Sequence, residues 1–125
     1  MIIQRLAAFT LSALLLTAAA AYAHEAAKGR NGGMRVDAGA YHAELVVDGG
    51  TTVTVYLTDE ADKPVAVTGV KANAIFVVGA QPVRFGLAAA DATKLTGTAP
   101  VAIPADAKGV IQFVMPDGKT TQAKY

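Results

Sequence analysis

The chain has 125 residues, with 11 basic and 10 acidic side chains, no Cys and no Trp. This length supports one domain at most, since compact domains usually need about 100 residues each. The balanced charge gives no electrostatic reason to bind nucleic acid. The lack of Cys excludes disulfides, thiolate metal sites, iron–sulfur clusters and thiol nucleophiles.

Residues 1–23 have the pattern of a secretory signal peptide. Arg5 supplies the positive charge, an apolar run follows, and the stretch ends in small residues. An uncleaved membrane anchor is the alternative, because the apolar stretch 6–23 lies at the lower length limit for crossing a bilayer. We favour cleavage, since the last third is rich in Ala and no Lys/Arg cluster follows directly. We therefore expect a periplasmic protein with no membrane span after cleavage.

The position of the cut decides how the mature chain begins. Cleavage after Ala23 makes His24 the first residue and leaves 102 residues, whereas cleavage after Ala21 leaves two residues before His24. Both positions fit the small residues at this end of the segment. Residues 24–33 then form a polar, glycine-containing leader that we expect to be flexible at least in part. Residues 34–125 form the remaining domain.

The domain consists of short runs of alternating apolar and polar residues separated by turn residues, which is typical of antiparallel strands. The runs recur about every ten residues, and no convincing amphipathic helix occurs between them. The sequence therefore predicts an all-β fold: a small antiparallel β-sandwich (Ig-like) or a barrel, with seven to nine short strands. The expected strands are 41–47, 52–58, 64–67, 72–78, 83–87, 94–98, 109–115 and 119–125.

The first two strands are separated by Asp48-Gly49-Gly50. A three-residue loop there, with Gly in the left-handed conformation, pairs Leu45 with Val53 and keeps the apolar residues on one face. The same register sets His42 opposite Tyr56 on the polar face.

Two further segments contain proline or glycine at positions that predict their local structure. Pro64–Val67 reads as a short edge strand, because Pro cannot donate a ladder hydrogen bond. The turn Pro116-Asp117-Gly118 predicts a hairpin that pairs Phe113 with Thr121.

The mature chain lacks the residues for common catalytic machinery. Its only Ser, Ser12, lies in the signal peptide, and no Cys is present, so Ser–His–Asp and Cys–His catalysis are excluded. Most carboxylates lie in turns, where local hydrogen bonding explains them. We predict that the protein is not an enzyme.

Histidine is the side chain that points to metal chemistry. A mature chain starting at His24 offers its α-amine and imidazole to one ion, and His42 can add a third nitrogen, a set that Cu(II) favours. If the cut falls after Ala21, His24 is third from a free amine and suits a square-planar Cu(II) or Ni(II) chelate. The alternative is that His24 follows the signal peptide by chance.

Three residues complete this metal hypothesis. His42 lies on the polar face of its strand, and Glu44, two residues on, can accept from its ring or join the metal ligands. Met34 offers a thioether that suits Cu(I). The alternative for His42 is an exposed cross-strand pair with Tyr56.

Several segments together resemble a known group of proteins: Gly39 to Val47, Val55 to Asp59, Lys63-Pro64-Val65 and Pro116 to Ala123. They resemble small, uncharacterised periplasmic β-sandwich proteins that accompany, or are fused to, heavy-metal efflux adaptor components of Gram-negative bacteria. The resemblance covers most of the mature chain and implies a role in heavy-metal (copper) resistance. In that pattern a His precedes the Gly-Gly of the leader, where this chain has Arg30-Asn31. A weaker similarity is to CopC-type copper carriers, whose Met-rich loop this chain lacks.

These observations give two hypotheses. The first is a protein of heavy-metal homeostasis that binds or hands over Cu(II) or Cu(I) through His24, His42, Glu44 and Met34. The second is an interaction module that binds no metal and docks onto an envelope efflux or adaptor complex through an edge strand such as Pro64–Val67.

Overall fold

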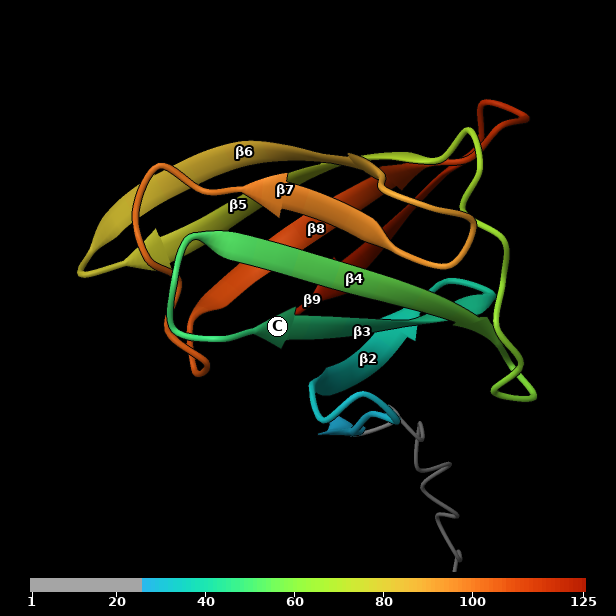
Figure 1. Cartoon of the computed structure of the whole chain (residues 1–125), viewed down its shortest axis with the longest axis horizontal. Coiled ribbons are helices and arrows are strands. Elements are labelled where there is room, and N and C mark those ends of the chain that lie inside the picture. Colours follow the sequence, from blue (N-terminus) through green and yellow to red (C-terminus); the bar gives the residue numbers. More distant parts are fainter. Residues whose placement is uncertain (1–25) are drawn as a thin grey trace, which may run out of the picture.

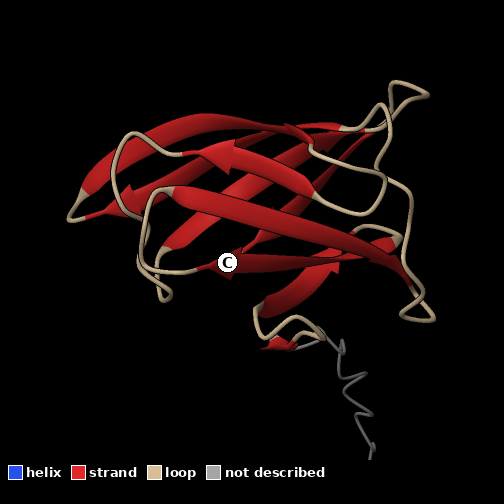
Figure 2. Ribbon diagram, viewed as in Figure 1, coloured by secondary structure: helices blue, strands red, loops and turns tan. Residues whose placement is uncertain are grey.

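The structure is a computed structural model that describes residues 26–125. The predicted signal peptide, both cleavage positions and His24 lie outside the described residues. Residues 26–125 form nine strands and no helix (Figures 1 and 2), which confirms the all-β prediction. The strands are β1 (Ala27–Lys28), β2 (Met34–Ala38), β3 (Tyr41–Val47), β4 (Thr52–Asp59), β5 (Lys71–Val78), β6 (Gln81–Ala89), β7 (Leu95–Thr98), β8 (Lys108–Val114) and β9 (Thr120–Lys124).

All nine strands belong to one antiparallel sheet, in the order β1-β2-β3-β4-β7-β6-β5-β8-β9. The sheet curls into a half-barrel (Figure 1), so that β9 returns toward β2 and β3. The Tyr125 hydroxyl, just after β9, donates a 3.1 Å hydrogen bond to the carbonyl of Ala43 in β3. One continuous curled sheet thus takes the place of the two separate sheets expected for an Ig-like sandwich.

The core fills the concave side of this sheet. The alternation in β5 is regular, with Ala72, Ala74 and Phe76 buried and the residues between them exposed. The Phe76 ring stacks against that of Phe85, and it meets the Tyr125 ring with centroids 6.1 Å apart. Tight packing of this kind stabilises a domain that has no disulfide.

The two predicted hairpins have different outcomes. The turn after β8 is confirmed: Phe113 pairs with Thr121, and Gly118 has a φ of 83°. The register between β3 and β4 is wrong by two residues, because Leu45 pairs with Val55. The loop is longer because the carbonyls of Gly50 and Thr51 accept hydrogen bonds from the backbone after β7. A shift of two residues preserves which face each side chain occupies, so the apolar face is unchanged.

The edge strand expected at Pro64–Val67 does not form. The segment makes a single bridge, between Thr58 and Pro64. The amide of Val65 donates to Leu57, and that of Val67 donates to Ala92. The amides of Val65 and Val67 are therefore bonded within the molecule, and docking through this segment stays a prediction.

Residues 26–33 form a hairpin with β2. The two residues of β1 pair with the first two of β2, and the Gly29 amide donates to the Gly33 carbonyl. This part of the segment expected to be partly flexible is therefore built into the edge of the sheet. Residues 26–125 contain no helix with the length and apolar character that crossing a bilayer requires.

Candidate functional site

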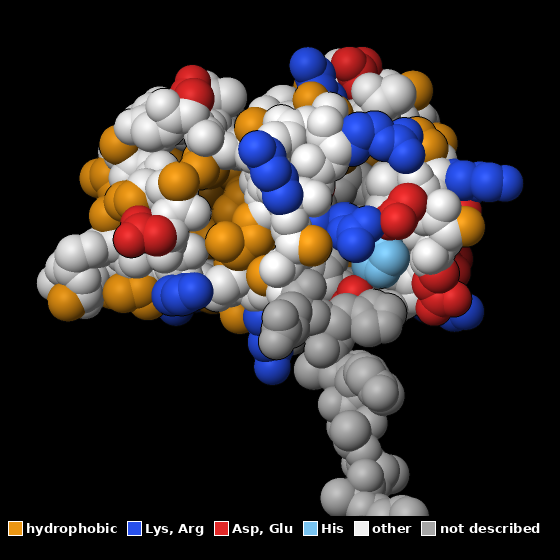
Figure 3. Space-filling model, turned by 90° about the horizontal axis from the view of Figure 1, so that it is seen from below, with side chains coloured by type: hydrophobic (Ala, Val, Ile, Leu, Met, Phe, Trp, Pro, Cys, Tyr) orange, Lys and Arg blue, Asp and Glu red, His pale blue; other side chains and the backbone are white. Residues whose placement is uncertain are grey.

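The candidate site lies on the convex face of β2, β3 and β4. Strand pairing sets Asp37 beside His42 and Arg35 beside Glu44. Although this is the polar face of the strands, His42 is only 9 % exposed and Glu44 only 5 %. Figure 3 shows the histidine, in pale blue, next to Lys/Arg and Asp/Glu side chains. Two loops, 29–33 and 59–63, supply groups that contact this face.

Both ring nitrogens of His42 face carboxylates. Nδ1 lies 2.9 Å from Oδ1 of Asp62, and Nε2 lies 3.3 Å from Oδ1 of Asp37. In the sheet His42 stands opposite Thr58. The alternative of an exposed His42–Tyr56 pair is therefore wrong, because the register moved and the ring is covered.

Asp62 links this histidine to an arginine. Its Oδ1 also accepts a hydrogen bond from Arg35. The hydrogen bond with His42, followed by that from Arg35, holds the pKa of the Asp62 carboxyl below its usual range. Sequence reasoning placed Asp62 only in a charged turn and missed this contact, because its partners come from β2 and β3.

The conformation of Asp62 explains how its carboxylate reaches these partners. The residue has a φ of 59°, in the left-handed region that non-glycine residues seldom occupy, although Asp is several-fold enriched there. The turn is held by Asp59, whose carboxylate accepts from the amides of Ala61 and Lys63. A non-glycine residue at the usual glycine position thus places its side chain between His42 and Arg35.

The carboxylate of Glu44 contacts the 29–33 loop. Its carboxylate accepts hydrogen bonds from the Asn31 amide (2.9 and 3.1 Å), the Asn31 side chain (3.0 Å) and the Gly33 amide (2.8 Å). A Cβ on Gly29 would lie 2.1 Å from Cδ of Glu44, so the loop needs glycine where it crosses the carboxylate. Glu44 therefore holds the 29–33 loop against β3.

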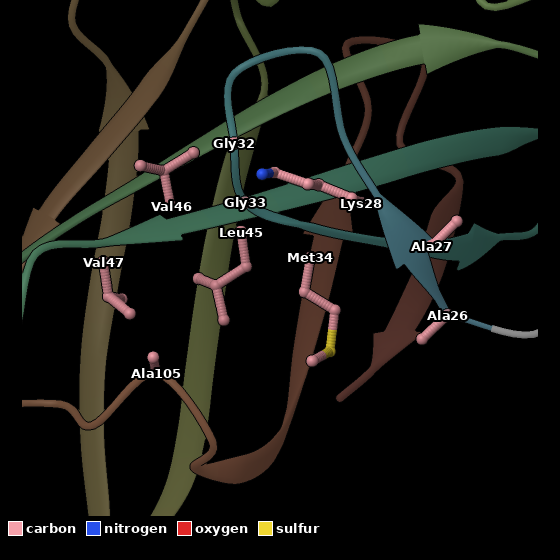
Figure 4. Close-up of a pocket in the computed structure, with 10 residues that line it drawn as sticks. All are labelled: Ala26, Ala27, Lys28, Gly32, Gly33, Met34, Leu45, Val46, Val47 and Ala105. Carbon is pink, nitrogen blue, oxygen red and sulfur yellow. The ribbon is translucent and has the colours of Figure 1, made fainter.

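Met34 lies on the other face of the sheet. It alternates with Arg35 and joins the core side with Val36. Figure 4 shows Met34, Leu45 and Val47 pointing to the same side, with Ala105 opposite Val47, around a pocket of about 360 Å³. The structure brings His42 and Glu44 onto one face, but it does not bring Met34 to them.

A hollow of about 310 Å³ opens beside His42. It is lined by Asp37, Gly39, His42 and Glu60. Within residues 26–125, no three His, Asp or Glu side chains are arranged to hold a metal ion. A metal site at this hollow would need a further ligand.

Comparison with protein-family models, with curated proteins and with solved structures found no match. The resemblance to efflux-associated periplasmic proteins remains a prediction from the sequence.

Proposed function

We propose that the protein is a secreted, periplasmic protein that binds or hands over a copper-like metal ion. His42 supplies an imidazole from the β domain, and His24 supplies an imidazole and, after cleavage at Ala23, its α-amine. The observation that carries the proposal is the contact between Asp62 and Nδ1 of His42, beside a hollow with further carboxylates.

This contact resembles the arrangement of a metal-binding histidine. Such a residue usually donates the hydrogen of one ring nitrogen to a carboxylate, which fixes the ring and directs the other nitrogen at the metal. In the proposed site Asp62 is this carboxylate, and it faces Nδ1 of His42. Nε2 is then the ligand atom, and Asp37, 3.3 Å away, is the neighbouring carboxylate.

The chain before β1 is long enough to complete the site. Neighbouring strands lie about 4.8 Å apart, so β1 and β3 are separated by roughly 10 Å. Ala27 pairs with Arg35 in an antiparallel ladder, so the chain preceding it starts toward the Asp37 end of β2. Two residues span up to about 7 Å. We propose that His24, two residues before the first described residue, adds its ring to the ion held by His42.

The contacts of Glu44 and Met34 reduce the set of ligands that we propose. Glu44 accepts hydrogen bonds from the 29–33 loop and Met34 faces the core, which leaves His24 and His42 of the predicted ligands, and we add Asp37 as the carboxylate beside Nε2 of His42. Nitrogen and oxygen ligands suit Cu(II) better than Cu(I), which prefers sulfur. Binding requires deprotonated nitrogens, so we expect affinity to fall in acid.

Mass spectrometry of the secreted protein and calorimetry test the proposal together. The mature N-terminus is determined first, and the protein is then titrated with Cu(II), Ni(II) and Zn(II). We expect Cu(II) binding tighter than micromolar that is lost in His24→Ala and His42→Ala, and weakened about tenfold in Asp62→Asn. Asp106→Asn, an exposed loop carboxylate, is the matched control. Binding no tighter than micromolar, or binding that survives His42→Ala, would overturn the proposal.

A further inference from the structure

The convex face of β6, β5, β8 and β9, called the basic face below, lies on strands other than those of the candidate metal site. We propose that it docks the protein on an anionic lipid surface, with a headgroup phosphate in a hollow beside Arg84. This inference goes beyond the proposed metal binding and does not depend on it.

The charges on the basic face all have one sign. The charged residues of these four strands are Lys71 of β5, Arg84 of β6, Lys108 of β8 and Lys124 of β9. All are exposed, and within residues 26–125 none of them forms an ion pair. The acidic residues nearest to them along the chain lie in the loops that flank the strands. The face therefore attracts a negatively charged surface.

Two large apolar side chains are exposed between these cations. Ile75 is 38 % exposed and Val77 is 53 % exposed, although the residues that alternate with them in β5 are buried. Strand pairing places Ile75 beside Arg84 and Val77 beside Lys108. At a bilayer surface, cations meet the headgroup phosphates while apolar groups enter the boundary with the acyl chains. The basic face presents both kinds of group together.

A hollow of about 530 Å³ opens beside Arg84 on this face. Gly86 and Gln112 pair with Asn73 from either side, and the absence of a side chain on Gly86 leaves the space open. No carboxylate lines the hollow. Within the described part of the chain, the side chains of Arg84, Asn73 and Gln112 have no hydrogen-bond partner. A guanidinium and two amides are therefore free to donate to a phosphate.

The composition of the face suits a lipid surface better than a protein partner. Three of its four cations are lysines, which are depleted at protein–protein interfaces. Two exposed aliphatic side chains also make a small apolar centre for a stable protein interface. A layer of headgroups needs positive charge near it rather than a shaped complement. An anionic lipid surface is therefore the occupant that fits the face.

Vesicle co-sedimentation of the secreted protein, freed of metal, tests the proposal. One set of vesicles is pure phosphatidylcholine, and the other contains about 40 mol % phosphatidylglycerol. We expect binding to the anionic vesicles at least about tenfold tighter than to the neutral ones, and release when salt is raised to about 0.5 M. No binding to anionic vesicles, or equal binding to both kinds, would overturn the proposal.

Two soluble probes distinguish the other occupants. Sodium polyglutamate represents an acidic protein, and glycerol phosphate represents a free headgroup. We expect neither to bind as tightly as the anionic vesicles do, because neither offers an apolar layer for Ile75 and Val77. Tight binding of polyglutamate without vesicle binding would assign the face to an acidic protein. Tight binding of glycerol phosphate without vesicle binding would assign the hollow to a small anion.

Charge substitutions locate the surface. Arg84→Gln combined with Lys124→Gln should weaken binding to anionic vesicles at least about tenfold. The matched control combines Lys28→Gln with Lys63→Gln, two exposed lysines outside the basic face, and should bind as the parent does. Circular dichroism of each variant confirms the fold. Equal losses in the two double variants, or no loss in the first, would refute the basic face.

Apolar and hollow substitutions separate docking from simple charge attraction. Ile75→Thr combined with Val77→Thr keeps β-branched residues in the strand and should weaken vesicle binding about threefold, and Asn73→Val should do the same. Val101→Thr is the control, because Val101 is 45 % exposed and lies in the loop after β7. If the folded β5 variants bind like the parent, the apolar side chains and the hollow take no part in docking, and the proposal fails.

Discussion

Replacing Glu44 by Ala should release the N-terminal hairpin and cost about 3 kcal/mol of unfolding free energy. Hydrogen bonds to a charged group contribute about 1.5–3 kcal/mol each, and Glu44 accepts from three donor groups on two residues. The full total is not expected, because the 29–33 loop lies at the surface and its amides can turn to water once the carboxylate is gone. A loss of about 3 kcal/mol is a large part of the 5–15 kcal/mol typical of a domain.

Urea unfolding followed by circular dichroism measures this loss, and a fall in Tm of about 15 °C should accompany it. Hydrogen exchange at the Gly33 amide should accelerate, because its acceptor is removed. Glu44→Gln keeps the shape and should lose only about 1–2 kcal/mol. The control is Glu60→Ala, an exposed carboxylate whose removal should change stability by less than about 0.5 kcal/mol. If Glu44→Ala costs less than about 1 kcal/mol and leaves exchange at Gly33 unchanged, Glu44 does not anchor the loop.

Three further predictions concern the sheet. Tyr125→Phe removes the hydrogen bond to Ala43 and should cost about 1 kcal/mol in urea unfolding. Burial, followed by the charge of Glu44, raises the pKa of Tyr125, so the parent should lose stability as pH rises above the ordinary tyrosine value of about 10, a loss that Tyr125→Phe should lack. Gly97→Ala should cost at least about 2 kcal/mol, because its Cβ would lie 2.3 Å from the Gly86 carbonyl oxygen, whereas Gly86→Ala, with a nearest contact of 3.8 Å, should be tolerated; equal Tm values for the two would contradict this. Ala80→Gly should raise stability by about 0.5 kcal/mol, since Ala80 has a φ of 66° in the β5–β6 turn, and a lower Tm would count against that account.

The sequence predicted the positions of strands and turns better than the register in which strands pair. Alternation in 52–58 and the Pro-Asp-Gly turn at 116–118 depend on adjacent residues, and both predictions hold in the structure. The β3–β4 register depends instead on where the loop carbonyls of Gly50 and Thr51 find donors, and these come from the segment after β7. No pattern within 41–58 contains that information.

The candidate site shows the same limit. Alternation correctly placed His42 and Glu44 on one face, and the apolar neighbours Val36 and Ala38 would have placed Met34 on the other. Alternation does not say what covers a face. The ring of His42 is reached by Asp62 from a turn twenty residues away, so its burial follows from the tertiary structure alone.

The hydrogen bond between Tyr125 and Ala43 joins residues 82 positions apart. A contact between such distant residues affects the order in which parts of the sheet fold. The hairpins β3–β4 and β8–β9 can form from local contacts, but the half-barrel brings its ends together only when β9 reaches β2 and β3. Contacts so distant in sequence slow folding, because the loop between them must be ordered before they contribute. We therefore expect the N-terminal strands to keep their apolar face partly exposed until the C-terminal strand docks, which makes that docking the late step of folding.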